Sequence, residues 1–170
     1  MRPTNKIILA SLSMAAVFIT LYVANVIMTP SWSFEITTDK PVYNLGENVQ
    51  ITVTLKNKGY VSHSFTAAVD NPVLVSIEYV NPSNPTVKYQ VWYTPYQESE
   101  TTFTVSPNQP LTRTCTWNQT DIQGWQFWNT TYKAGTYYIE AFIPKKEEGF
   151  PSESNHALFL AWVYINVTAT

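Results

Sequence analysis

The chain has 170 residues, 45% of them apolar and 15% aromatic, which is enough to fill the core of one domain in addition to a membrane anchor. Its formal net charge is −2, from 10 basic and 12 acidic side chains, and its longest basic run is Lys145-Lys146. Nucleic-acid binding needs clustered Lys and Arg to neutralise phosphates, so the composition argues against that function class.

The chain contains a single cysteine, Cys115, which cannot form an internal disulfide or a multi-cysteine zinc site. We expect it to be a small buried apolar residue on a strand. A reactive thiol or an intermolecular bridge is the open alternative.

An uncharged apolar segment, residues 7–28, predicts a transmembrane helix. At ~1.5 Å per residue it would be about 33 Å long, which matches the ~30 Å hydrocarbon core. Arg2 and Lys6 precede the segment and no basic residue follows until Lys40, so residues 1–6 are expected in the cytoplasm and the rest outside. A cleaved signal peptide is the alternative, but its apolar region is usually ~7–15 residues and ends at a small-x-small site. We therefore favour an uncleaved signal anchor in the cell membrane, with an extracellular C-terminal domain.

Residues 29–32 are expected to be a linker, and residues 33–170 one β-domain. The clearest alternation lies in Asn48–Asn57, where Val, Ile, Val and Leu at positions 49, 51, 53 and 55 would share one face. Further strands are expected at 33–38, 61–69, 73–80, 88–94, 101–105, 111–117, 135–143 and 157–165. The last of these is apolar on both faces, so we expect both faces to be covered. Seven to nine strands separated by Pro-containing turns predict an all-β, immunoglobulin-like antiparallel β-sandwich.

Motifs for catalysis are absent from the sequence: it has no G-x-S-x-G, H-E-x-x-H or P-loop pattern. His63 and His156 have no metal-spaced partner, and we interpret both as surface or rim residues. Asp70-Asn71 and Asp121 are too scattered to predict a calcium site.

Two pairs of carboxylates lie in polar, loop-like stretches, at Glu98/Glu100 and Glu147/Glu148. A general acid needs burial to raise its pKa, and nothing apolar surrounds these residues in sequence. We interpret them as solvated loop charges, and expect no catalytic residue, metal or cofactor.

Three N-x-[ST] sequons, at Asn118, Asn129 and Asn166, lie on the expected outer side of the anchor and are candidate N-glycosylation sites. The stretch between Trp117 and Tyr138 is rich in aromatic residues, and Trp125 and Trp128 lie there between polar residues. These two tryptophans are the candidate binding surface, because exposed rings stack on sugars or on apolar groups of a partner. The alternative is that most of these rings cap the open end of the sandwich.

The same stretch resembles the C-terminal half of the BsuPI-type proteinase-inhibitor domain. The match consists of a strand ending in Trp, then Gln, Asp and Gly, and a Gly-Thr-Tyr turn before a further strand; its residues here are Trp117, Gln119, Asp121, Gly124, Gly135 and Tyr137. The resemblance covers about residues 34–143, with Ala134 in place of the usual Pro. It implies an immunoglobulin-like sandwich and protein binding, including protease inhibition, but it marks no inhibitory residue. We expect Gly135 to occupy a turn with positive φ, and Trp117 and Tyr137 to pack in the core.

These observations lead to the hypothesis of a membrane-anchored extracytoplasmic domain that binds another protein, such as a protease. Two alternatives stay open: a structural or adhesive component of the cell surface, and a carbohydrate-binding module that uses Trp125 and Trp128.

Overall fold

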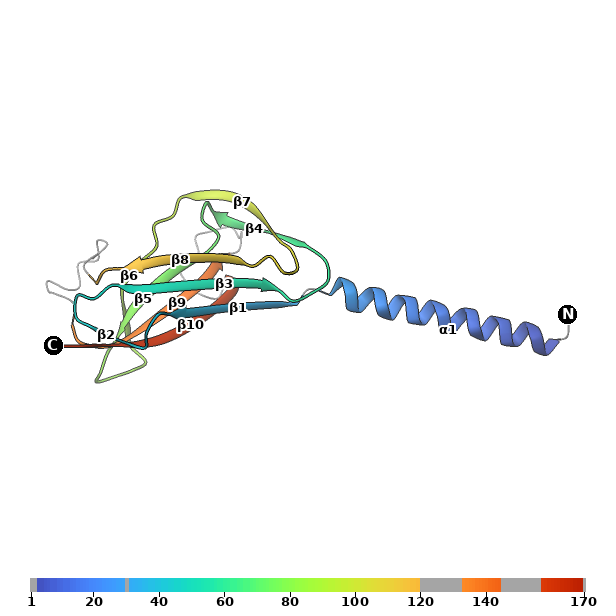
Figure 1. Cartoon of the computed structure of the whole chain (residues 1–170), viewed down its shortest axis with the longest axis horizontal. Helices are drawn as coiled ribbons and strands as arrows, with labels where there is room; N and C mark the ends of the chain where they lie inside the picture. Colours follow the sequence, from blue (N-terminus) through green and yellow to red (C-terminus); the bar gives the residue numbers. More distant parts are fainter. Residues whose placement is uncertain (1–2, 30, 120–132, 145–156, 170) are drawn as a thin grey trace.

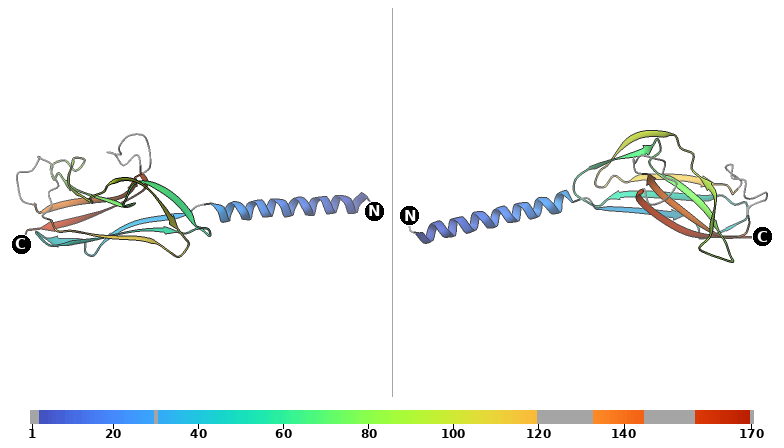
Figure 2. Two further views of the ribbon diagram at one scale, coloured as in Figure 1. Left: turned by 90° about the horizontal axis from the view of Figure 1, so that it is seen from above. Right: turned by 180° about the vertical axis from the view of Figure 1, so that it is seen from behind.

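The protein consists of one long helix followed by a β-sandwich (Figure 1). The computed structural model describes residues 3–29, 31–119, 133–144 and 157–169, and within the helix it describes the side chains of residue 14 and residues 16–28. Helix α1, Pro3–Met28, projects away from one end of the sandwich (Figures 1 and 2). Over the residues so described, no helix has both the length and the apolar character needed to cross a membrane.

The described part of the chain after the helix forms ten strands. They are β1 (Trp32–Thr38), β2 (Val42–Asn44), β3 (Val49–Asn57), β4 (His63–Val69), β5 (Leu74–Val80), β6 (Lys88–Tyr93), β7 (Glu98–Val105), β8 (Leu111–Trp117), β9 (Gly135–Pro144) and β10 (Ala157–Thr168). They build a sheet of order β1-β3-β8, a larger sheet of order β2-β10-β9-β5-β6, and a two-stranded β4-β7 sheet.

The strand order is that of an immunoglobulin-like sandwich. β1-β3-β8 has the order of strands A, B and E of such a domain, and β10-β9-β5 has the order of G, F and C. The described pairs are antiparallel except for β2, which runs parallel to the end of β10. The predicted all-β sandwich is confirmed.

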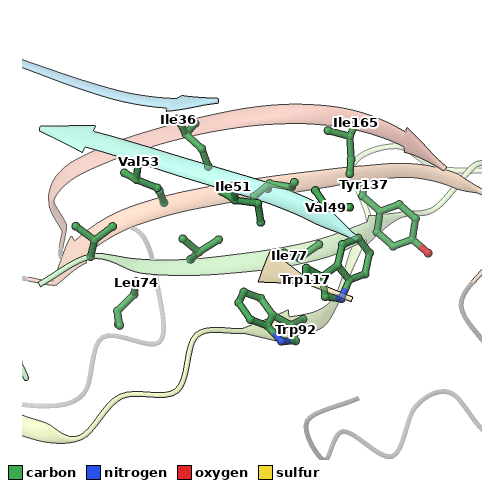
Figure 3. Packing of buried hydrophobic residues seen from close by; sticks show 14 of the residues in the cluster. Ile36, Val49, Ile51, Val53, Leu74, Ile77, Trp92, Trp117, Tyr137 and Ile165 are labelled. Atoms are coloured by element: carbon green, nitrogen blue, oxygen red, sulfur yellow. The ribbon is translucent and has the colours of Figure 1, made fainter. Parts of the chain in front are cut away.

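Alternating side chains of the two larger sheets fill the core between them (Figure 3). Val49, Ile51, Val53 and Leu55 of β3 are all at most 1% exposed, as their spacing predicts. Ile139 of β9 faces them from the opposite sheet and is fully buried.

Three predictions about the strands are wrong. The described residues form ten strands and not seven to nine, because β2 has only three residues, too few to show an alternating pattern in the sequence. Glu98 and Glu100 are exposed on strand β7 and do not lie in a loop, because pairing with β4 supplies the backbone partners whatever the polarity of the side chains. The second face of β10 is not covered: Leu160, Trp162 and Tyr164 are 38%, 57% and 51% exposed. Helix α1 points away from the sandwich and does not cover this face (Figure 1).

Candidate functional site

The outer surface of the larger sheet carries the best candidate site, which we call the aromatic face. Its members come from two neighbouring strands: Leu160, Trp162 and Tyr164 of β10, and Tyr138, Glu140 and Phe142 of β9. The register sets them side by side in three pairs, namely Leu160 with Phe142, Trp162 with Glu140, and Tyr164 with Tyr138. Because side chains alternate along a strand, all six lie on the outer side of the sheet, where Phe142 also packs against part of the core cluster.

Exposure differs between the two columns of the aromatic face. The three β10 side chains are the exposed column, whereas Glu140 and Phe142 are half-buried and Tyr138 is 8% exposed. The Tyr138 and Tyr164 rings contact each other, with centroids 5.2 Å apart. Trp162 therefore presents its ring to solvent beside the more buried side chains of β9.

Two further charged residues border the aromatic face. Glu78 of β5 lies opposite Tyr138, and Lys88 of β6 places its Nζ 3.3 Å from the centroid of the Tyr138 ring. Burial raises the pKa of Glu78; the nearby Lys88 lowers that pKa and the nearby Glu140 raises it further. Burial also raises the pKa of Tyr138, whose hydroxyl donates a hydrogen bond to the Glu140 carboxylate. The face thus combines rings, two carboxylates and one ammonium group.

The residues that resemble the proteinase-inhibitor family form a structural cluster inside the sandwich. The Tyr137 ring lies between the rings of Trp117 and Tyr79, at centroid distances of 5.0 and 5.4 Å. Gly135 has φ +155°, and a Cβ there would lie 2.7 Å from Cε2 of Tyr79. The expectations of core packing for Trp117 and Tyr137, and of positive φ for Gly135, are confirmed. Gly135, however, begins strand β9 and does not lie in the predicted turn.

Gln119 ties the end of β8 to the turn between β2 and β3. Its Oε1 accepts a hydrogen bond from the Gly46 N–H at 2.9 Å, and its Nε2 donates to the carbonyl oxygens of Asn44 and Glu47 at 3.1 and 2.8 Å. The side chain is 1% exposed and its φ is 59°. Gln119 thus has a structural role, whereas Asp121 and Gly124 of the same motif lie outside the described residues.

Several predicted site residues lie outside the described part of the chain, so their predictions stay open. These are Trp125, Trp128, Asn129, Glu147, Glu148 and His156. Of the two described sequons, Asn118 is half-buried just after β8. Asn166 is exposed on β10, where its Oδ1 accepts a hydrogen bond from Thr136 at 2.9 Å.

His63 and Cys115 lie on strands of the sandwich, β4 and β8, and belong to its framework. The His63 ring packs edge-on against Trp32, at 5.7 Å between centroids, so His63 is half-buried at the rim of the sandwich. Cys115 lies on β8 as predicted but is half-buried, and burial raises the pKa of its thiol to about 11. Among the described residues, no three His, Cys, Asp or Glu side chains come together as metal ligands do.

Sequence reasoning missed the aromatic face. The signal was present in the final strand, where the exposed Leu160, Trp162 and Tyr164 alternate with less exposed residues, but an apolar run on both faces was interpreted as covered on both. Glu140 and Tyr138 could be assigned to the same face only once the register of β9 and β10 was known.

Comparison with known proteins gives structural likenesses alone. No family model and no curated protein matches the sequence. A β-glucosidase, EmGH1, from Erythrobacter marinus is similar over 82% of this chain and 16% of its own, with 14% identity and a TM-score of 0.46. A β-glucosidase from Listeria innocua in complex with isofagomine is similar over 83% of this chain and 16% of its own, with 13% identity and a TM-score of 0.48.

A further likeness is to the CARDB domain of the PF1109 protein from Pyrococcus furiosus, in complex with di-metal ions. It covers 83% of this chain and 90% of that domain, with 17% identity and a TM-score of 0.41. The chain thus spans a small share of the two glucosidases and most of the CARDB domain. Likenesses of this size assign neither a family nor an activity.

Proposed function

We propose that the protein is a single-pass, membrane-anchored protein that displays an immunoglobulin-like domain outside the cytoplasm and binds another protein non-covalently through the aromatic face. The observation that carries the proposal is the exposed column of Leu160, Trp162 and Tyr164. Trp and Tyr supply large, rigid contact areas and are enriched among the residues that dominate binding energy at interfaces. A sandwich needs one apolar face on each sheet to build its core, so exposed rings on the outer face add nothing to that core.

The membrane anchor is proposed from the sequence and from the character of α1. Residues 7–28 carry no charge, and the basic residues nearest to them lie on the N-terminal side. The large apolar side chains that the structure describes in α1 are exposed at 37–72%. A helix that is apolar all round is typical of one that lies in lipid or in a large core.

The topology can be tested by thiol labelling on intact cells. In a Cys115→Ala background, Ser83→Cys places a thiol on the exposed turn before β6, and Thr4→Cys places one ahead of the uncharged run. A membrane-impermeant maleimide should label position 83 on intact cells, and position 4 only after permeabilisation. Labelling of position 83 only after permeabilisation would contradict the extracellular assignment.

The binding surface can be tested by site-specific photo-crosslinking of the full chain in its own cells. A photoreactive residue at Trp162 or Tyr164 should give a discrete protein adduct, whereas one at Tyr60, which is 74% exposed away from this face, should not. Equal adducts at all three positions, or none, would remove the aromatic face as the binding surface.

The resemblance to BsuPI-type domains adds the hypothesis that the bound protein is a protease. The four described motif residues in this chain have structural roles, so inhibition would have to come from loops or from a sheet edge. The purified full chain should then inhibit serine proteases. Absence of inhibition at micromolar excess would reject inhibition and leave protein binding standing.

The two other functions stay open as alternatives. Self-association of the purified full chain with no foreign partner would favour a structural or adhesive role. Carbohydrate binding through Trp125 and Trp128 predicts that tryptophan fluorescence changes across a glycan panel.

A further inference from the structure

The aromatic face already holds one cation that belongs to the chain itself. Lys88 reaches from β6 past β5, and its Nζ lies 3.3 Å from the centroid of the Tyr138 ring on β9. Glu78, opposite Tyr138, is close enough to Lys88 for the ammonium group to lower the carboxyl pKa. A ring face with a carboxylate nearby therefore already holds an ammonium group on this surface.

The same pairing of ring and carboxylate recurs one step along the sheet. Trp162 lies directly opposite Glu140, and its ring is 57% exposed, whereas Glu140 is half-buried. Trp is the strongest aromatic partner for a cation. The ion pairs within the described residues are Lys40–Glu47 and Lys56–Glu35, so Glu140 takes part in neither.

Charge decides which partner suits this surface. The aromatic face and its border carry two carboxylates, Glu78 and Glu140, and one ammonium group, Lys88. Beyond residue 28 the chain has 8 basic and 12 acidic side chains, because two of its 10 basic residues, Arg2 and Lys6, precede the uncharged segment 7–28, and 8 − 12 = −4. A partner of opposite charge would relieve the repulsion between the two carboxylates, and an acidic partner would increase it.

We infer, on the basis of the proposed function, that the partner protein presents a basic segment whose Lys or Arg side chain lies between the Trp162 ring and the Glu140 carboxylate. The cation stacks on the Trp162 ring, as the Lys88 ammonium group does on Tyr138, and its N–H groups donate to the Glu140 carboxylate. Leu160 and Tyr164 flank the position along β10 and supply apolar contact for the aliphatic part of that side chain.

The inference can be tested with two matched peptides and the full chain in detergent. The probes are acetyl-Gly-Arg-Thr-Arg-Gly-amide and its citrulline counterpart, which keeps the shape of arginine and removes its charge. Fluorescence polarisation of labelled peptides should show at least about tenfold tighter binding of the arginine peptide, with affinity that falls as salt is raised. Equal binding of the two peptides, or binding of neither, would overturn the cationic partner.

Matched variants place the interaction on the aromatic face. Trp162→Ala and Glu140→Gln should each weaken binding of the arginine peptide by roughly fivefold or more. Tyr60→Ala and Glu98→Gln remove an exposed ring and an exposed carboxylate elsewhere, and should leave binding unchanged. Circular dichroism should show the same β spectrum for all four variants.

Other outcomes separate this inference from the proposed function. Equal losses in the face and control variants would overturn the inference. Displacement of the arginine peptide by a neutral oligosaccharide would also overturn it, in favour of a carbohydrate ligand. If the peptides fail while crosslinking at position 162 succeeds, protein binding stands and the cationic partner does not.

Discussion

The two large sheets of the sandwich have matching inner sides and contrasting outer sides. The outer side of β1-β3-β8 is polar and rich in threonine, with Thr54 opposite Thr112 and Thr52 opposite Thr114. The outer side of β10 and β9 instead presents Trp162 beside other rings. Since the described strands of the threonine-rich side have no apolar residues on their outer surface, we expect the exposed rings of the other sheet to contribute little to forming the sandwich. The comparison therefore assigns stability to the inner sides and leaves one outer side for the partner recognition that we propose.

The largest effect on stability is expected from a tryptophan on the inner side of a sheet. It tests whether the inner sides stabilise the fold. Trp117→Ala removes a fully buried ring that packs 5.0 Å from Tyr137, and should lower the free energy of unfolding by about 3–5 kcal/mol. Urea denaturation of the full chain in detergent, followed by circular dichroism, measures it. A loss below about 1 kcal/mol would show that the ring packs far less tightly than its burial indicates.

The next effect tests the buried connection between β8 and the β2–β3 turn. Gln119→Ala leaves the Gly46 N–H and the Asn44 and Glu47 carbonyl groups without their side-chain partner, and should cost about 1–3 kcal/mol. The same denaturation experiment applies. Gln119→Glu keeps the size and the acceptor but loses the donor, so it should also destabilise; a neutral result for both variants would contradict the structural role.

The inner sides were predictable from sequence because burial and alternation coincide there. Val49 to Leu55 alternate in a single strand, so the pattern predicted both the strand and its buried face. The aromatic face was not predictable, because its two columns come from strands joined by a long connection and their register is set only by pairing. Likewise the apolar character of the β10 side chains does not reveal whether anything lies above them. The candidate site at Trp125 and Trp128 lies outside the described residues and stays a prediction.

A smaller effect is expected from the electrostatics of the aromatic face. Burial raises the pKa of Glu78 above its ordinary value of 4.5, so the folded state prefers the neutral carboxyl. The stabilising contribution of that preference is complete below about pH 4.5 and is lost as the pH rises through the raised pKa. Glu78→Gln cannot ionise and should therefore become more stable relative to the parent protein between pH 4 and pH 7.

Paired urea denaturation curves at pH 4 and pH 7 measure the change. Glu98→Gln, on the exposed part of β7, is the control for removal of a carboxylate. A stability difference between the Glu78→Gln variant and the parent that shrinks as the pH rises would show that the attraction of Lys88 outweighs burial at this site.

The smallest effect on stability, and the sharpest test of the comparison, comes from changing the two outer sides alone. Thr114→Ala and Trp162→Thr both alter exposed side chains on strands, and each should change the free energy of unfolding by less than about 1 kcal/mol. Only Trp162→Thr should weaken partner crosslinking, measured with a photoreactive residue at position 164. If Trp162→Thr were as destabilising as Trp117→Ala, the ring would belong to the core of the fold, and the division between a stabilising inner side and a recognising outer side would fail.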